Sequence, residues 1–305
     1  MNSPPIEWVT YQLKELFINA TRQGPVPRHV GFVMDGNRRF AKKNHIETAE
    51  GHNMGFDALA KAGFTIAVCY KSGVEAVTVY AFSIENFKRP LHEVNALMEI
   101  AKFKLNQICQ HGDLLDRFGV KLRVLGQLDL VREDVREVID EAIDITKDNN
   151  KCVLNICFPY TSRNEITTAV RSIVNLSTTP NCPPSPSFSD SSTTSTASSK
   201  TALAGLSDFE SITEQTLTEH MFTSDSPPLD LLIRTSGVRR LSDFLLWQCH
   251  QDTEIVFVDC LWPQFDIWHF LPILTDWAIK QKKKDKTAAA MRRQEEGLGQ
   301  RIPVR

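Results

Sequence analysis

The sequence predicts an α/β fold with a central, mostly parallel sheet of about six strands flanked by helices. Short apolar runs rich in β-branched residues alternate along the 305 residues with longer segments whose apolar residues recur every three to four positions. This alternation is typical of βαβ units, and runs that are apolar throughout suit strands covered on both faces.

The elements follow one another in a regular order. Strands are predicted at 30–34, 76–82, 121–125, 153–158, 229–233 and 254–258. Helices are predicted at 50–72, 91–111, 129–149, 163–176 and 207–222, and they should cover the sheet.

A single domain, residues 25–281, contains all of these elements. Residues 177–204 form a Ser/Thr/Pro-rich tract that is too polar to bury, and we expect a disordered insertion between two helices. Residues 1–24 predict an amphipathic helix that lies either at a membrane interface or on its own domain. Residues 282–305 are a basic tail that either contacts anionic lipid or is simply solvated.

Composition narrows the class of protein. A formal net charge of −2 gives no basic field for nucleic acid, so any anion site must be local. The seven cysteines are odd in number and contain no CxxC pair, which argues against a disulfide framework and favours a reducing compartment. No apolar stretch reaches the roughly 18 residues of a membrane span, so we expect a soluble or peripheral protein.

A candidate metal site follows the first predicted strand, in the segment FVMDGNRRFA. Asp35 comes where this strand should end, and ligands of parallel sheets bind at the carboxyl ends of strands. Gly36 permits a tight turn, and a helix beginning near Arg38 would present free N–H groups to an anion. A single carboxylate in such a place suits Mg²⁺, although Asp-Gly-Asn is also a common turn.

A second cluster lies in residues 229–248, LDLLIRTSGVRRLSDFLLWQ. An apolar strand again ends in an arginine, Arg234, after which Arg239, Arg240 and Ser242 are predicted to begin another helix. An arginine guanidinium group can donate two parallel hydrogen bonds to the oxygens of a phosphate. This cluster therefore predicts a site for a diphosphate or two phosphates.

A third segment, YAFSIENFKRP at 80–90, places Ser83, Asn86 and Arg89 among aromatic residues. Polar groups beside aromatic walls indicate an amphiphilic ligand, although the aromatic residues also suit an ordinary core. His52 could contact a phosphate, but a lone histidine is more often structural.

Other phosphate-binding motifs are missing from the sequence. It contains neither GxxxxGK[ST] nor GxGxxG, which excludes the P-loop and the dinucleotide fingerprint. The acidic run at 133–144 alternates with apolar residues at helical spacing, so we interpret it as a solvated helix face rather than a metal motif.

Taken together, these clusters resemble the cis-prenyltransferases, the undecaprenyl and dehydrodolichyl diphosphate synthases. The resemblance extends from about residue 29 to 268 and is strongest in HVGFVMDGNRRFAKK, EGH, VYAFSIENFKR, LNICFPYTSRNEI, LIRTSGVRRLSDFLLWQ and DCLWPQF. Within the family, the chain is most similar to the eukaryotic, fungal-type catalytic subunits.

The resemblance implies a role for each site residue. Asp35 would bind Mg²⁺ and act in catalysis with Asn37, and Glu254 would be a second metal contact. The allylic diphosphate would be bound by Gly36, Asn37, Arg38, Arg39, His52, Ser83, Asn86 and Arg89. Isopentenyl diphosphate would be bound by Arg234, Arg240 and Ser242.

The same resemblance implies a reaction. Mg²⁺-dependent, sequential cis-condensation of isopentenyl diphosphate onto farnesyl diphosphate would give a long-chain polyprenyl diphosphate for dolichol synthesis and protein glycosylation. The growing chain needs a hydrophobic tunnel between sheet and helices, and we expect its walls to include Phe56, Leu59, Leu97, Met98, Ile100 and Leu105.

Two features depart from the homodimeric family members. The sequence lacks their C-terminal Arg-x-Gly motif, and Thr48 stands where bacterial enzymes often have arginine. The resemblance therefore implies a heteromer with a related noncatalytic membrane subunit that carries Arg-x-Gly. Such an enzyme would be peripheral, on the cytoplasmic face of the endoplasmic reticulum or on lipid droplets.

Two alternatives belong to other classes. A noncatalytic scaffold subunit of the same fold would be expected to lose Asp35 and the arginines, which this chain retains. An unrelated phosphate-binding enzyme, such as a nucleotide hydrolase, should carry a purine-binding motif, and we find none.

Overall fold

The computed structural model describes residues 24–47, 50–51, 54, 69–110, 118–178 and 212–299. Three predictions fall almost entirely outside these residues. They are the N-terminal helix at 1–24, most of the helix at 50–72, and the Ser/Thr/Pro-rich tract at 177–204.

A six-stranded sheet forms the centre of the molecule, in the order β3-β4-β2-β1-β5-β6. Its strands are β1 His29–Val33, β2 Ala76–Tyr80, β3 Val120–Leu125, β4 Cys152–Cys157, β5 Leu231–Arg234 and β6 Glu254–Phe257. Every pair of neighbouring strands is parallel. The predicted α/β class and parallel sheet are confirmed.

The strand order changes direction at β1. From β1 the chain crosses to β2 on one side, and after β4 it returns to β5 on the other side. Parallel sheets bind ligands at the carboxyl ends of strands beside such a switch point. At that edge Val33 is in register with Tyr80 of β2 and with Arg234 of β5.

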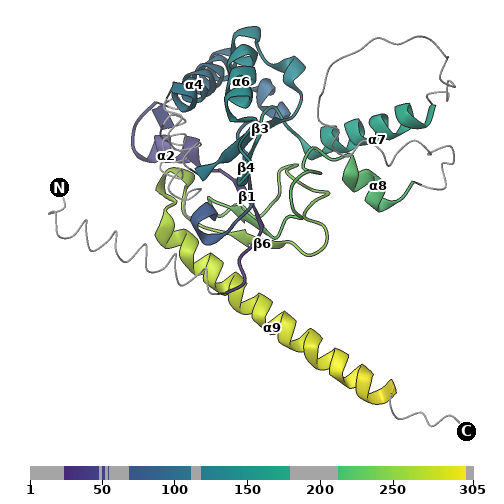
Figure 1. Cartoon of the computed structure of the whole chain (residues 1–305). Coiled ribbons are helices and arrows are strands. Elements are labelled where there is room, and N and C mark those ends of the chain that lie inside the picture. Colours follow the sequence, from purple (N-terminus) through teal and green to yellow (C-terminus); the bar gives the residue numbers. More distant parts are fainter. Residues whose placement is uncertain are drawn as a thin grey trace, which may run out of the picture.

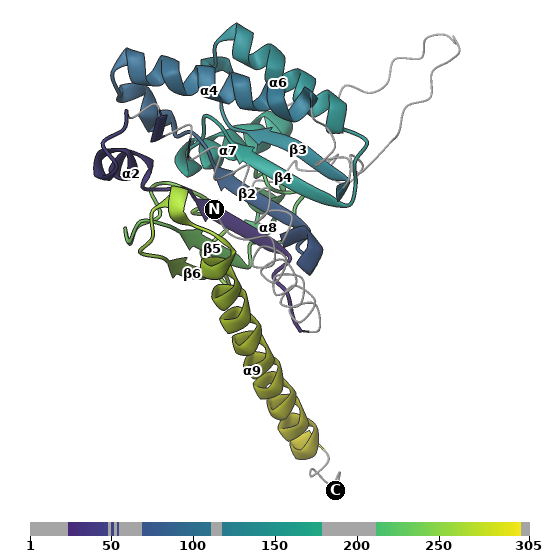
Figure 2. The same ribbon diagram turned by 90° about the vertical axis from the view of Figure 1, so that its left-hand side faces the viewer.

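Helices cover both faces of the sheet. Helices α4 and α6 lie side by side on one face, and α7 and α8 lie on the other (Figures 1 and 2). The helical elements are α2 Asn37–Lys43, η1 Ile84–Lys88, α4 Leu91–Gln110, η2 Leu128–Leu130, α6 Glu133–Thr146, α7 Ser162–Thr178, α8 Glu214–Glu219, η4 Trp262–Gln264 and α9 Ile267–Gly299.

Strand β1 is buried along its whole length because it contributes to both cores. Val30 and Phe32 pack in the core that includes α4 and α6, whereas Val33 packs in the opposite one. A Cβ at Gly31 would lie 2.9 Å from Cδ1 of Leu232, so any larger residue there would force that side chain to shift. Burying a side chain such as Phe32 contributes about 2–3 kcal/mol, which makes β1 a strong anchor for the residues that follow it.

Two predicted helices differ from the structure. The helix expected to begin at 239 does not form, because Ser242, Asp243 and Leu245 have positive φ angles of 52°, 61° and 46°. Left-handed residues interrupt a right-handed helix. Of the helix predicted at 207–222, the described residues contain only α8, whose start is fixed by a capping box at Thr213.

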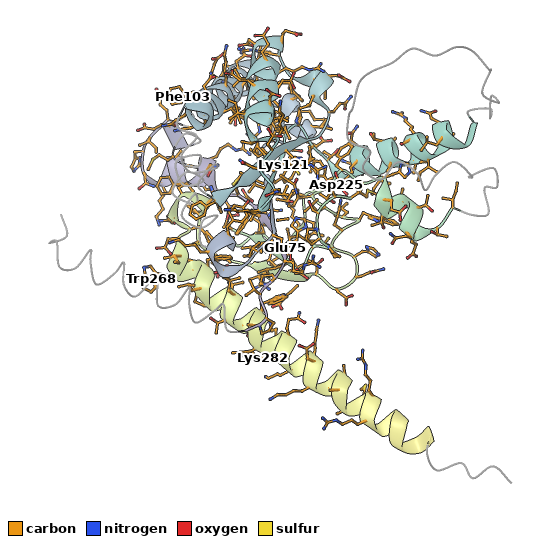
Figure 3. The ribbon with its side chains drawn as sticks, viewed as in Figure 1. Glu75, Phe103, Lys121, Asp225, Trp268 and Lys282 are labelled. Atoms are coloured by element: carbon orange, nitrogen blue, oxygen red, sulfur yellow. The ribbon has the colours of Figure 1, made fainter. Side chains whose placement is uncertain are left out.

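Helix α9 has two different halves. Phe270, Leu274 and Trp277 are buried against the body, whereas residues 282–293 are all exposed. The helix is continuous across the predicted boundary at 281–282, and its outer half projects from the body with Lys282 beside the point of departure (Figures 1 and 3). No helix in the described ranges combines the length and apolar character needed to span a bilayer.

A buried network of polar side chains connects strands β1, β2 and β4. His29 is 1% exposed, and its Nδ1 and Nε2 lie 2.8 Å from the Pro227 carbonyl and 2.7 Å from Thr78 Oγ1. Asn155 Nδ2 donates to the same Thr78 oxygen at 3.0 Å. Burial lowers the pKa of His29 to about 4, more than the bond to Pro227 raises it.

The lowered pKa of His29 predicts that acid destabilises the folded state. The unfolded chain binds a proton on His29 below pH 6.5 but the folded chain does not until about pH 4, so stability is lost as pH falls through this window. The full loss amounts to about 3 kcal/mol. Urea unfolding at pH 7 and pH 5 should reveal it, and His29→Gln should flatten the pH dependence. Identical slopes in the two proteins would contradict the assignment.

Candidate active site

Asp35 lies directly beyond β1, and its carboxylate is held from two sides. Arg234 Nη2 donates to Oδ2 at 2.8 Å, and the Gly36 N–H donates to Oδ1 at 2.7 Å. Arg39 Nη2 lies 3.6 Å from Oδ2. Burial alone would raise the pKa of this carboxyl group, but the hydrogen bonds from Arg234, Ser236 and the Gly36 N–H, together with the charge of Arg234, outweigh burial and lower the pKa. Asp35 is therefore ionised, and 33% of its side chain remains exposed to the cavity side.

Gly36 turns the chain from β1 into α2. Its φ of 109° is one that L-residues rarely adopt, and a Cβ there would lie 2.8 Å from Cδ2 of Leu261. The turn places Asn37, Arg38 and Arg39 in the first turn of α2. Asn37 Oδ1 is buried and has no hydrogen-bond partner among the described residues.

Arg234, the last residue of β5, joins this cluster to the second one. Its side chain is 4% exposed. In addition to Asp35, it donates through Nη1 to Ser242 Oγ at 2.7 Å and to the carbonyl of Arg240. Two segments that lie 199 residues apart are thus brought together by one guanidinium group.

The third predicted segment borders the same site. Ser83 caps η1 by accepting from the Glu85 N–H at 3.2 Å. Arg89 Nη2 donates to Asn86 Oδ1 at 3.0 Å, and Arg89 Nη1 donates to Glu93 at 2.9 Å. These bonds orient Asn86 and Arg89 at the end of β2.

All three segments line one cavity of about 980 Å³ at the carboxyl edge of the sheet. Apolar side chains complete its wall beside the polar groups: Val33, Met34, Phe82, Leu97, Val238 and Trp262. The predicted site residues that line it are Asp35, Gly36, Asn37, Arg38, Arg39, Ser83, Asn86, Arg89, Arg234, Arg240 and Ser242. His52 lies outside the described residues.

Glu254, the second predicted metal contact, does not line this cavity. It is the first residue of β6 and is in register with Leu231, the first residue of β5. Because the strands are parallel, it lies at the opposite edge of the sheet from Arg234. Its carboxylate accepts from Lys280 of α9 at 2.6 Å.

The predicted tunnel walls are only partly covered by the structure. Leu97 lines the cavity, while Met98 and Leu105 are buried in the core beneath it. Ile100 is half-buried, and Phe56 and Leu59 lie outside the described residues.

Several cavity residues were missed by the sequence analysis, among them Lys42, Glu85, Arg163 and Asp243. Arg163 donates through Nε to Asp243 Oδ2 at 2.7 Å, and its Nη2 lies 3.6 Å from Glu85. The available signal was its position soon after β4, since the neighbouring strands β1, β2 and β5 end at this cavity.

The charges of the cavity suit a polyanion with a metal. Its cationic residues outnumber its carboxylates, and Glu85 and Asp243 are both paired with Arg163. Asp35 is also paired, with Arg234, but it is the carboxylate that the sequence predicts to face a ligand, and 33% of its side chain remains exposed. Within the described ranges no group of three or more His, Cys, Asp or Glu residues could hold a metal alone. Mg²⁺ commonly uses one or two carboxylates and completes its shell with water and phosphate, so the donors present fit it.

Comparison with known proteins places these observations in a family. The prenyltransferase family model for undecaprenyl diphosphate synthase matches residues 33–285. A dehydrodolichyl diphosphate synthase complex subunit of Schizosaccharomyces pombe is 46% identical over 282 residues, covering 92% of this chain and 96% of the relative. The corresponding human complex subunit is 40% identical, covering 91% of this chain and 76% of the relative.

Solved structures agree with this relationship. Lavandulyl diphosphate synthase from Lavandula x intermedia, in complex with dimethylallyl diphosphate, is 25% identical with a TM-score of 0.69. The alignment covers 83% of this chain and 95% of that one.

The site predicts binding of inorganic pyrophosphate, measured by calorimetry in the presence of Mg²⁺. Arg234→Gln removes the buried charge and its bonds to Ser242 and Arg240, and it should weaken binding about tenfold or more. Arg132→Gln removes the same charge from a surface ion-pair cluster and should leave binding unchanged. Equal weakening in both variants would argue against a local site.

Proposed function

This chain belongs to the undecaprenyl diphosphate synthase family of prenyltransferases, and we propose that it is the catalytic subunit of a dehydrodolichyl diphosphate synthase. The observation that carries the proposal is the ionised Asp35, paired with Arg234 at the mouth of a cavity with an apolar wall. The substrates are farnesyl diphosphate and isopentenyl diphosphate, and the product is a polyprenyl diphosphate for dolichol synthesis.

The allylic diphosphate binds above β1 and η1 in this proposal. Asp35 holds Mg²⁺ together with the diphosphate, and Arg38, Arg39 and Arg89 neutralise its remaining charge. The chemistry that bound Mg²⁺ supplies is stabilisation of the negative charge on the departing diphosphate. The hydrocarbon tail extends toward Leu97 and the other apolar residues, which exclude water from the reacting carbon.

Isopentenyl diphosphate binds to Arg240 and Ser242, which Arg234 orients. This arrangement holds the second double bond close to the first carbon of the allylic substrate. A bond forms between the double bond and that carbon as its bond to diphosphate oxygen breaks, and a proton then passes from the adduct to the released diphosphate. Asn37, which lines the cavity, orients the substrate for this proton loss.

The rival proposal is a noncatalytic scaffold with the same fold. A scaffold has no need for a carboxylate held ionised by a buried arginine, because that pair is expensive to desolvate. We therefore favour catalysis, in a heteromer with a related membrane subunit. The naming of the relatives as complex subunits supports such a partner.

Elongation tests the proposed catalytic role. The chain is co-expressed with its partner subunit and supplied with Mg²⁺, farnesyl diphosphate and radiolabelled isopentenyl diphosphate. Asp35→Ala should lower the rate by about 10²–10³-fold, as expected for loss of an electrostatic contact in the transition state. The exposed Asp129→Ala is the matched control and should retain full rate. Undiminished elongation by Asp35→Ala would favour the scaffold.

We also propose that the complex is peripheral to the endoplasmic reticulum membrane, with the exposed outer half of α9 contacting anionic lipid. Its charged residues include Lys282, Lys283, Lys284 and Lys286. Each lysine close to an anionic surface contributes about 1 kcal/mol, and salt screens the effect.

Vesicle sedimentation tests this contact. Binding to vesicles that contain phosphatidylserine should be strong at low salt, and changing Lys282, Lys283 and Lys284 to Gln should weaken it. A charge-matched variant with Lys104, Lys121 and Lys147 changed to Gln removes three lysines from the main body and should bind normally. Equal losses would attribute binding to net charge rather than to α9.

A further inference from the structure

The loop at residues 241–246 has an unusual backbone for a segment that carries a ligand-binding residue. Ser242, Asp243 and Leu245 all have φ angles between 46° and 61°, a region that non-glycine residues adopt infrequently. Such a conformation persists only where the surrounding structure enforces it. The contacts that enforce it therefore decide where Ser242 and Arg240 lie.

The first turn of α7 makes those contacts. The Ser162 N–H donates to the Asp243 carbonyl at 2.8 Å, and the Leu246 N–H donates to Ser162 Oγ at 3.0 Å. Asp243 also accepts from Arg163, through its N–H at 3.1 Å and its Nε at 2.7 Å. Ser162 is fully buried, so water competes little for its two bonds, whereas the Arg163 side chain that holds Asp243 is 72% exposed.

The opposite side of the loop faces the cavity. Ser242 Oγ accepts from Arg234 at 2.7 Å. The Phe244 ring stacks on Tyr80, with 4.6 Å between ring centroids. The loop is thus fixed between α7 on one side and the ends of β2 and β5 on the other.

Asp243 lines the cavity but is unsuited to contacting a diphosphate. Its carboxylate has the same sign of charge as the ligand, and both of its oxygens already accept from Arg163. Its contribution must therefore act through the backbone that it holds in place.

We propose that Asp243 and Ser162 are positioning residues, which clamp the 241–246 loop to α7 so that Ser242 and Arg240 face isopentenyl diphosphate. The inference rests on the proposed function, because that function assigns the second diphosphate to these two residues. Neither Asp243 nor Ser162 was assigned a role from the sequence. The clamp connects the first turn of α7 to the two residues assigned to isopentenyl diphosphate.

Steady-state kinetics of the complex with its partner subunit tests the clamp. KM for isopentenyl diphosphate is measured at saturating farnesyl diphosphate, and KM for farnesyl diphosphate at saturating isopentenyl diphosphate. Asp243→Ala and Ser162→Ala should each raise the first KM about tenfold, as expected for loss of one or two hydrogen bonds, and change the second less than about twofold. Asp243→Asn keeps an oxygen for the Arg163 N–H and should restore much of the lost affinity.

Arg163 is not a suitable test position, because it also contacts Glu85 of η1 and would disturb both halves of the cavity. The control is Asp225→Ala, which removes the carboxylate of another Asp–Arg pair, with Arg123, at a side chain that is 81% exposed. This control should leave both KM values unchanged. If Asp243→Ala does not fold, the same two KM values are measured for Ser162→Ala and Asp243→Asn, and these decide the question.

The outcomes separate the two proposals. Parallel changes in both KM values, or none, in an active complex would overturn the clamp and leave the proposed function standing. Absence of elongation by the unaltered complex would overturn the proposed function, and the clamp as stated would fall with it.

Discussion

The ion pair between Asp35 and Arg234 is the interaction on which the site depends. Arg234 is almost completely buried, and a buried guanidinium must find acceptors or cost several kcal/mol in lost solvation. It finds them in Asp35, Ser242 and the Arg240 carbonyl, which come from two distant parts of the chain. The need to satisfy one charge therefore brings the segments that begin at Asp35 and Arg234 to the same place.

The surrounding structure makes this pair rigid. Asp35 follows a strand that is buried on both faces, and its carbonyl accepts from the Trp262 N–H at 3.0 Å and from Thr235 Oγ1 at 2.8 Å. Backbone and side chain are thus held by different neighbours, so the carboxylate is aimed before any ligand arrives. Preorganisation of this kind lowers the reorganisation required in a transition state. The apolar wall of the cavity strengthens the effect, because charges interact more strongly where water is scarce.

Much of the fold followed from the sequence because local patterns decided it. Strand and helix positions came from periodicity, and the rule that parallel strands bind ligands at their carboxyl ends identified Asp35, Ser83 and Arg234. Tertiary contacts decided what the patterns missed. The loop after Arg234 resembles a helix start, but hydrogen bonds to Ser162 and Arg163, which no local pattern contains, hold it in left-handed turns. The distance of Glu254 from the cavity follows from the same rule, since the first residue of a parallel strand lies at the amino edge.

Helix α9 has a consequence that concerns folding rather than chemistry. A helix in water must first fix one turn at a loss, after which each added residue gains a bond, and isolated helices shorter than about 12–15 residues are marginal. The buried turns around Phe270, Leu274 and Trp277 supply that nucleus. The solvent-exposed turns beyond residue 281 therefore only extend a helix that has already begun, and their helical conformation depends on the packing of the inner turns against the body. Loosening Trp277 would fray the lysine-rich end without altering a single residue in it.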